Sequence, residues 1–469
     1  MALRPTDLLQ KVRSVVFSTR WQGIGLDDFA DHTTEDIGTR MARTEALARD
    51  LGKAVATEEK VLDELLPEVV ASDGRLWSFG QGLLDATTDA GMMWSRLVTA
   101  LTATDESLRK PQALRGFLHP LRARNPALAT TLLDNAVEHE TLARWYPFLQ
   151  VAVDIELEDV ARLKRSLAFG KAPVEMYIYL AYGRATDPIP AADLRELVLT
   201  MAEMPSGHDV ALEILQMRLH SDEQRKQGIA PELIDAGCEL IRKLAFTKKN
   251  DREDYGLGDI ARSCLKGAKG AAVTKEICRK LKSAVAKYET SAFYHGDLLH
   301  GLFGAQPTAA LDGLCGGDVK ELEQGIRILE DVGIRKHALA VVSDEDLVRW
   351  CDQEPQTRYP AIAQVITISQ RTSDNVPPRW TSIALRFLEK APNPGEILKQ
   401  FVAQFTPSSG WSGSLAAILE SNATLLDQLG AYPDLSVPVR QEKERLRQWI
   451  EDQKRRETAS DRERDERFE

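Results

Sequence analysis

The chain has 469 residues, more than a single hydrophobic core usually holds, so we expect either two or three domains or one elongated repeat array. Apolar residues make up 43% of the chain and charged residues 28%, the balance of an ordinary soluble globular protein. With 60 basic and 71 acidic residues the net charge is −11, which argues against a general attraction to nucleic acid or to a membrane surface.

Targeting and redox signals point to the cytoplasm. The N-terminal run MALRPTDLLQKVRSVVF has no long apolar stretch or cleavage site, so we expect no signal peptide. No stretch approaches the ~18 uncharged apolar residues of a membrane span. The cysteines are odd in number, widely spaced and without metal-ligand spacing, which indicates reduced thiols in the core. They are Cys238, Cys264, Cys278, Cys315 and Cys351.

The N-terminal part, residues 1–110, predicts helices that are irregularly spaced. The expected helices cover 5–17, 34–56, 58–70 and 94–101, the second of them capped by Thr34. Gly74, Gly80 and Gly82 are expected to interrupt the run between the last two helices. We therefore treat 1–110 as an irregular helical region.

From residue 111 to 435 the pattern becomes regular, with helical segments that alternate with short breaks at Pro, Gly or Asn. The run VITIS at 365–369 is the one β-like stretch, and it stands in a helical context. The predicted helices cover 126–137, 140–153, 157–169, 173–182, 191–204, 208–219, 231–246, 257–265, 271–288, 297–303, 319–331, 345–351, 359–369, 379–390 and 396–405.

Helices this short are marginal in isolation and need neighbours to hold them. Consecutive amphipathic helices with short connections pack as antiparallel pairs, and pairs that recur at a spacing of roughly 35–45 residues are typical of HEAT- or armadillo-like arrays. The sequence thus predicts an all-α fold, an α-solenoid of degenerate HEAT/armadillo-like helix pairs, whose units match by period and not by identity.

The last stretch, 406–469, predicts a helical hairpin followed by a charged tail. One helical face carries apolar residues from Leu415 to Leu429, and a second runs from Val439 to Ile450 beyond breaks at Pro433 and Pro438. After Ile450 no apolar residue larger than alanine occurs until Phe468, so no further repeat can pack there. We predict that 436–469 forms a charged C-terminal capping helix.

The sequence lacks the common nucleotide-binding and metalloprotease motifs. The Walker A loop, the G-x-G-x-x-G loop after a strand and the HExxH pattern are absent from the sequence. Ser412 or Ser414, in a run that faintly resembles a nucleophile elbow, is better interpreted as a helix-capping residue. Ser263 and Lys266 form an SxxK pair without its companion motifs, which indicates a chance match.

One cluster of ionisable residues remains an alternative candidate for a catalytic or metal site. His295, Asp297 and His300 stand close together in the run HGDLLH, where a metal or acid–base role would need a third ligand and a pocket. A helix start with one histidine on each side of Asp297 explains the run more simply. We predict no enzyme activity, no cofactor and no metal site.

A basic segment, 242–287, stands out in this acidic chain. It predicts either a surface for nucleic-acid phosphates or an acidic partner, or only the solvated outer face of two helices. Its acids are few, and aromatic residues for base stacking are poorly interleaved. The candidate patch consists of Arg242, Lys243, Lys248, Lys249, Lys266, Lys269, Lys275, Arg279, Lys280 and Lys282.

Several runs resemble the C-terminal helical-repeat region of large bacterial STAND-type NTPases with NACHT-like cores, some of them implicated in antiphage defence. The runs are WCDQEPQTRYPAIAQV (350–365), APNPGEILKQFVAQFTPSSGWSGSLAAILE (391–420), DRERDERFE (461–469), LWSFGQGL (76–83), GHDVALEILQMRL (207–219) and LLHGLFGAQPTAALD (298–312). In that family the repeats follow an NTPase and an effector and serve as a sensor or partner-binding surface. This chain carries no P-loop, so the resemblance implies the repeat part alone and transfers no catalytic residue.

These observations together predict a cytoplasmic, non-catalytic helical scaffold that recognises a protein partner. The resemblance implies that the scaffold is the sensor part of a bacterial defence system and that its partner is a phage protein or an NTPase or effector chain. The alternative is a nucleic-acid-binding scaffold that uses the 242–287 segment. A helical enzyme built around His295, Asp297 and His300 is the third class.

Overall fold

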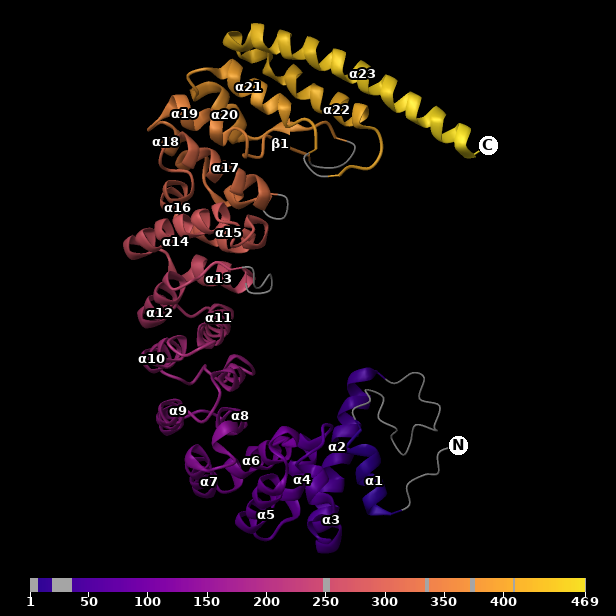
Figure 1. Cartoon of the computed structure of the whole chain (residues 1–469), viewed down its shortest axis with the longest axis vertical. Helices are drawn as coiled ribbons and strands as arrows, with labels where there is room; N and C mark the ends of the chain where they lie inside the picture. The colour runs from indigo at the N-terminus through magenta and orange to yellow at the C-terminus, as the bar shows by residue number, and fades with distance from the viewer. Residues whose placement is uncertain are drawn as a thin grey trace. The chain divides into compact units, whose positions relative to one another are not determined.

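The computed structural model describes residues 7–18, 36–247, 254–333, 337–371, 376–407 and 410–468, with side chains to residue 462. The chain divides into two compact units, Met1–Gly228 and Ile229–Glu469, which we call unit 1 and unit 2 (Figure 1). Most of the described residues are helical and only two short strands occur among them, so the all-α prediction is confirmed. The boundaries predicted after residues 110 and 435 mark where the helical pattern changes in regularity, whereas the two units are defined by their compactness. Those two boundaries therefore stay predictions.

The helices of unit 1 are α1 (Leu8–Val15), α2 (Ile37–Ala56), α3 (Glu59–Val69), α4 (Leu76–Ala86), α5 (Ala90–Ala103), α6 (Gln112–Arg124), α7 (Pro126–Glu138), α8 (Tyr146–Gln150), α9 (Leu157–Phe169), α10 (Ala191–Ala202) and α11 (Gly207–Gln224). Short 3₁₀ helices η1 (Glu106–Leu108), η2 (Ala143–Trp145) and η3 (Val174–Ala181) connect them. The helix predicted over 140–153 is wrong in extent. The ring nitrogen Nδ1 of His139 accepts from the backbone N–H groups of Thr141 and Leu142, which closes a tight turn where a helix was expected.

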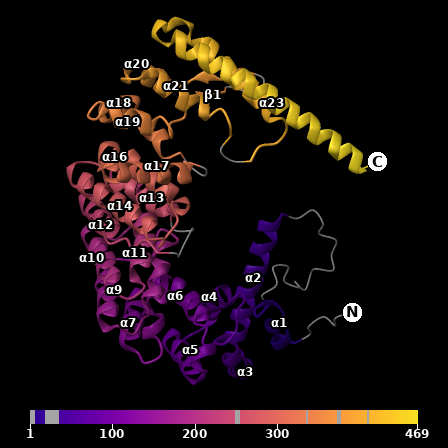
Figure 2. The same cartoon turned by 45° about the horizontal axis from the view of Figure 1, so that its top comes forward.

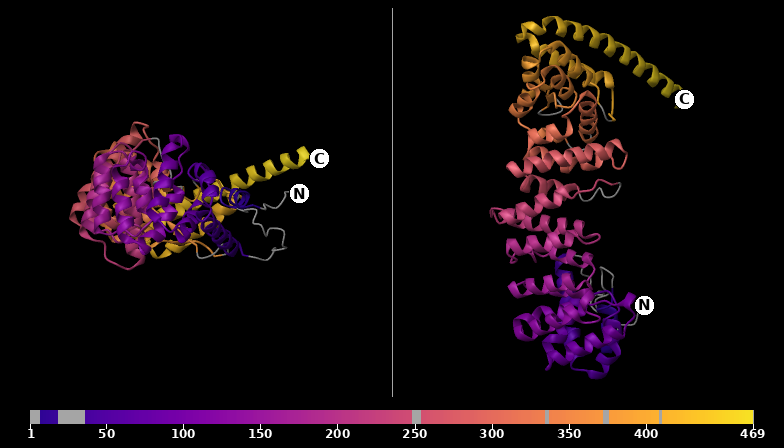
Figure 3. Two further views of the ribbon diagram at one scale, coloured as in Figure 1. Left: turned by 90° about the horizontal axis from the view of Figure 1, so that it is seen from below. Right: turned by 60° about the vertical axis from the view of Figure 1, so that its left-hand side comes forward.

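The helices of unit 2 are α12 (Pro231–Arg242), α13 (Asp254–Cys264), α14 (Ala268–Ala286), α15 (Gly296–Ala305), α16 (Pro307–Leu314), α17 (Val319–Gly333), α18 (Asp344–Cys351), α19 (Pro355–Ile362), α20 (Ser382–Lys390), α21 (Pro394–Ala403), α22 (Leu415–Asp427) and α23 (Ser436–Phe468). The 3₁₀ helices are η4 (Ala292–His295), η5 (Ala338–Val341), η6 (Gln428–Ala431) and η7 (Pro433–Leu435). In Figure 3 the helices of unit 2 lie in successive layers along the unit.

Two strands interrupt the helices of unit 2. The strands β1 (Ser369–Gln370) and β2 (Arg379–Trp380) pair antiparallel, with Ser369 opposite Trp380. The predicted helices over 359–369 and 379–390 are therefore too long, since α19 ends at Ile362 and α20 begins at Ser382. The indole Nε1–H of Trp380 donates to the carbonyl oxygen of Leu425 at 2.8 Å, which anchors β2 under α22. Of the β-like run at 365–369, only Ser369 belongs to a strand.

Helix packing follows one rule in both units: many helices pack against the next helix but one. In unit 1 these pairs include α2 with α4, α4 with α6 and α7 with α9. In unit 2 they include α12 with α14, α13 with α15, α14 with α16, α16 with α18 and α18 with α20. Each of these helices contacts both the next helix in the chain and the helix after that. Alternate helices therefore lie side by side in one layer.

Ion pairs join helices of the same layer. Arg49 Nε of α2 lies 2.7 Å from Asp85 Oδ2 of α4, and Lys275 Nζ of α14 lies 3.2 Å from Asp312 Oδ2 of α16. Arg96 of α5 meets Asp63 of α3 at 2.5 Å. The partners in these three pairs stand 36, 37 and 33 residues apart in the sequence. The same contact thus returns at nearly the same sequence spacing in both units.

Glycines bring α2, α4 and α6 into backbone contact. A Cβ on Gly82 would overlap the carbonyl oxygen of Arg49 in α2, and one on Gly80 would overlap that of Ala113 in α6. The prediction that Gly80 and Gly82 interrupt a helix is therefore wrong, because both lie inside α4 and serve close packing. Gly74 does lie in a turn, with a φ of +129° that L-residues rarely adopt.

All five cysteines are free and buried, as the sequence predicted. Desolvation raises the pKa of the Cys264 and Cys315 thiols to about 12, so these groups stay protonated and inert at neutral pH. They pack as small apolar residues in unit 2.

The C-terminal helix α23 packs against α22 and α21, as predicted (Figure 2). Leu426 of α22 and Leu446 of α23 are almost fully buried, while Trp449 is half-buried. The carboxylate of Glu457 accepts from Ser414 Oγ at 2.6 Å and from the Ala416 backbone N–H at 3.1 Å. These bonds tie the tail helix to the start of α22.

Candidate protein-binding surface

The start of α13 meets the start of α15 in unit 2, and α13 packs on α15. Asp254, the first residue of α13, is buried, and its carboxylate accepts from the backbone N–H groups of Asp297 at 2.6 Å and Leu298 at 3.0 Å. Asp254 thus satisfies the free N–H groups at the start of α15 and ties the starts of the two helices together.

Four large aromatic side chains lie exposed at these helix ends. They are Tyr255, Tyr288, Phe293 and Tyr294, and we call them the aromatic edge. Tyr288 is 84% exposed and Tyr255 is 64% exposed. The rings of Phe293 and Tyr294 meet edge-on, with centroids 5.5 Å apart. Exposed aromatic clusters of this kind are enriched in protein interfaces, where each ring supplies a large contact area at low entropic cost.

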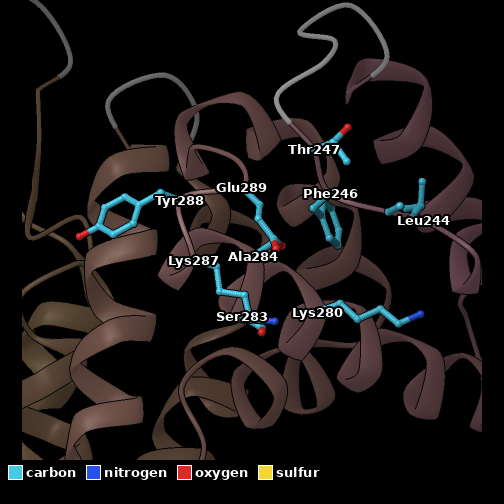
Figure 4. Close-up of a pocket in the computed structure, with 10 residues that line it drawn as sticks. Leu244, Phe246, Thr247, Lys280, Ser283, Ala284, Lys287, Tyr288 and Glu289 are labelled. Atoms are coloured by element: carbon cyan, nitrogen blue, oxygen red, sulfur yellow. The ribbon is translucent and has the colours of Figure 1, made fainter.

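A pocket of about 760 Å³ opens beside Tyr288 (Figure 4). Its walls come from the segment after α12 and from the last turns of α14, with Phe246, Lys280, Lys287 and Glu289 among the lining residues. Phe246 itself is buried and packs edge-on against the His295 ring at 5.1 Å. Tyr288 of the aromatic edge therefore borders a concave surface that has an apolar base and charged walls.

The HGDLLH run lies at the start of α15, next to Phe293 and Tyr294, and its described contacts stabilise the local structure. His295 is buried and its Nε2 lies 2.9 Å from Thr290 Oγ1, which fixes the loop before α15. Asp297 and His300 belong to α15, where the Asp297 backbone receives the Asp254 cap. In the part of the chain that the structure describes, no three His, Cys, Asp or Glu side chains gather closely enough to hold a metal ion.

The predicted basic patch divides over several elements. Arg242 and Lys243 end α12, while Lys269, Lys275, Arg279, Lys280 and Lys282 belong to α14, and Lys266 stands between α13 and α14. Lys248 and Lys249 lie outside the described residues. The structure therefore brings most of the predicted cations onto α14 and its neighbour α12.

Acidic residues neutralise much of this patch. Glu276 lies 2.9 Å from Lys280 and 3.6 Å from Arg242, Asp235 lies 3.5 Å from Lys269, and Asp312 pairs with Lys275. Asp235 and Asp312 come from outside the segment, so counting charges within 242–287 overstated its positive field. Among the described residues, Lys266 and Arg279 are exposed cations for which no acidic partner is found.

The predicted capping role of Ser414 is confirmed. Ser414 is the N-cap of α22, and its Oγ accepts from the backbone N–H of Ala417 at 3.0 Å. Ser263 lies inside α13, whereas Lys266 lies beyond its end, so the SxxK pair does not share one helix.

Sequence reasoning missed the aromatic edge, although a signal was present. Tyr255, Phe293 and Tyr294 fall between the predicted helices, and Tyr288 is the last residue of the helix predicted over 271–288, so no core position was expected there. Sequence reasoning also missed the cap at Asp254, an acidic residue three positions before the helix predicted over 257–265.

Comparisons with known proteins add no relative. No protein-family model, no curated protein and no solved structure matches the chain. Among the described residues, no helix combines the length and the apolar character that crossing a membrane requires.

Proposed function

We propose that the chain is a non-catalytic helical-repeat scaffold that recognises a protein partner through the aromatic edge. The observation that carries this proposal is the exposure of Tyr255 and Tyr288 on ends of helices that are otherwise tightly held. Rigid elements that present exposed tyrosines bind partners at little entropic cost.

The packing supports a solenoid of degenerate HEAT-like helix pairs. Alternate helices share a layer, and ion pairs between them recur at separations of 33 to 37 residues. That period lies within the range of two-helix repeats. Each helix-pair repeat of such an array contacts mainly the neighbouring repeats, and the array leaves one continuous surface open for recognition.

The resemblance of several runs to the repeat region of STAND-type NTPases gives the proposal its biological setting. In that setting the scaffold is the sensor part of a bacterial defence system. Its partner is then a phage protein or a separate NTPase or effector chain.

The experiment compares two variants with the wild-type chain. Tyr255→Ser combined with Tyr288→Asn removes both exposed rings, and asparagine suits the positive φ of 58° at position 288. Trp411→Ser is the matched control, because it removes an aromatic side chain that is 48% exposed elsewhere in unit 2. A partner retained by the tagged wild-type chain is purified and titrated against each variant.

We expect the double variant to bind at least about tenfold more weakly, since central aromatic residues contribute on the order of 2 kcal/mol each. The Trp411→Ser control should bind as the wild type does. Equal affinity of the double variant and the wild type would contradict the proposal.

A second candidate function, nucleic-acid binding, rests on Lys287 beside the exposed ring of Tyr288. A cation next to a free aromatic face suits the backbone and bases of a single strand. Salt-dependent binding of DNA or RNA that is lost on Lys287→Glu and Tyr288→Asn would favour it over a protein partner.

A further inference from the structure

A second pocket lies on another face of α14, apart from the aromatic edge. Its volume is about 870 Å³, and its lining comes from α14, α16, α17 and α19 and from the segments that follow α16 and α18. Lys275, Arg279 and Lys282 stand four and three residues apart, which places them on one helical face. Together with Arg358, Asp312 and Glu321 they form what we call the basic pocket.

Lys282 is the unusual member of the basic pocket. The residue is only 7% exposed, and the acceptor found for its Nζ is the carbonyl oxygen of Gly316, at 3.2 Å. An ammonium group can donate three hydrogen bonds, and a buried charge without a counterion is costly. In the part of the chain that the structure describes, Lys282 lines the pocket with donors to spare.

Arg358 is also buried and is held rigidly in place. Its guanidinium lies 4.0 Å from the centroid of the Trp350 ring and donates to the carbonyl oxygen of Trp350 at 2.8 Å. A second bond reaches Gln353 Oε1 at 2.9 Å, and Glu354 accepts at 2.5 Å. Arg358 thus presents a preorganised cation whose geometry does not depend on a ligand.

The charges of the basic pocket do not balance. Lys275 pairs with Asp312, whose other carboxylate oxygen accepts from the Trp350 indole at 2.9 Å. Glu321 is the second carboxylate of the lining, and Glu354 pairs with Arg358, so four cations face three anions. Among the described residues, no acidic partner is found for the exposed Arg279 or for the buried Lys282. These two cations suit a ligand with at least two negative charges.

A loop with two glycines closes one side of the basic pocket. Gly317 has a φ of +120°, and a Cβ there would overlap the Glu321 carboxylate, while a Cβ on Gly316 would overlap the carbonyl oxygen of Asp312. Glycine at both positions therefore lets the loop turn tightly between α16 and α17 at the rim of the pocket.

We propose that the basic pocket binds a small phosphorylated anion, such as a pyrophosphate group, free or carried by a nucleoside. Lys282 and Arg279 supply the charge that the ligand neutralises, and Arg358 and the Gly316–Gly317 loop shape the site. This inference is independent of the partner surface, although Ser283 lines both pockets.

The test is calorimetric titration of the full chain at 150 mM salt with pyrophosphate, ADP and a short single-stranded oligonucleotide. Saturable binding of pyrophosphate or ADP at one site per chain supports the proposal, and comparison of the two identifies whether the source is free or carried by a nucleoside. No binding of either at millimolar concentration would overturn the proposal, as would binding of the oligonucleotide alone.

Variants show whether the binding uses this pocket. Arg279→Gln should weaken binding at least tenfold without changing the fold, because Arg279 is exposed. Lys266→Gln is the matched control, an exposed cation outside the pocket, and should bind as the wild type does. Equal affinity of Arg279→Gln and the wild type overturns the proposal.

Lys282→Met separates a ligand-binding role from a structural one. Without ligand we expect its melting temperature to equal or exceed that of the wild type, because a poorly compensated buried charge is removed. Its affinity for pyrophosphate should fall at least tenfold. A lower melting temperature with unchanged affinity would show that Lys282 only supports the fold.

Discussion

The helices α2, α4 and α6 of unit 1 and the pair α22 and α23 of unit 2 are held together in different ways. In the first group glycines place backbone against backbone, so that a Cβ at Gly82 has no room. In the second group apolar side chains pack between α22 and α23, an interface that we call the seam. Charged residues form ion pairs at its edges, as Lys454 does with Glu420 at 2.5 Å. Backbone contact tolerates no added atom, whereas a seam fastened by surface charges should tolerate many changes.

The largest effect should come from Gly82→Val. The new side chain would collide with the backbone of Arg49, which cannot move without displacing α2. We expect a loss of about 3 kcal/mol or more in the free energy of unfolding, measured by denaturant titration. Gly91→Ala in α5 is the control, since its nearest neighbour stands 3.5 Å away, and it should be neutral or stabilising.

A change in the seam should act more locally. Trp449→Asp places a charge at a half-buried position of α23, so we expect the α22–α23 pair to unfold at a cost of about 2 kcal/mol. Limited proteolysis should then cut within α22 and α23. Gln448→Asp adds the same charge at an exposed position of the same helix and should leave the cleavage pattern unchanged. If both variants behave alike, the seam does not depend on Trp449.

Acid should loosen the start of α22. The hydrogen bond from Ser414, together with that from the Ala416 backbone, holds the pKa of the Glu457 carboxyl below its usual range. A depressed folded-state pKa means that the stabilisation is present above the unfolded pKa and is lost as the pH falls through the folded one. The protection factor of the Ala416 amide, which corrects for the intrinsic slowing of exchange at lower pH, should therefore fall on acidification. Glu457→Gln should remove this pH dependence, and a persisting one would assign it to another group.

The smallest effect should come from the end of the chain. Residues 458–462 are exposed, whereas Glu457 accepts a hydrogen bond from the start of α22. We expect deletion of 458–469 to change the melting temperature by no more than about 1 °C, because the tail adds only weak helix-surface pairs. A large loss on this deletion would show that the tail packs against the protein.

The sequence was informative where the pattern was local. The apolar period placed the helix expected over 319–331 almost where α17 lies, and Ser414 was identified as a cap. It failed where the decisive partner is distant in the chain. In the sequence Gly82 resembles a helix-breaking residue, but in the structure it lies inside a helix and packs against Arg49. Likewise, the basic segment appears unneutralised in the sequence, whereas Asp235 and Asp312 pair with its lysines in the structure.

The candidate surface shows the same limit. Tyr255 and Tyr288 are unremarkable in the sequence, since exposure depends on which helices cover a residue. Lys282 looked like one more surface lysine, and only the packing of α14 against α16 and α17 buries it. A local pattern predicts which residues are helical but not which of them meet.

The central claim is that alternate helices stack in one layer, and a double-mutant cycle on Arg49 and Asp85 tests it most directly. The hydrogen bond from Arg49 holds the pKa of Asp85 below its usual range, so the pair is ionised at neutral pH. Both side chains are partly exposed, so solvent screening limits the expected coupling to about 0.5 kcal/mol. We predict that Arg49→Asp and Asp85→Arg each destabilise the protein and that the combined swap recovers most of the loss. Strict additivity of the two changes would contradict contact between α2 and α4, and with it the stacking of alternate helices.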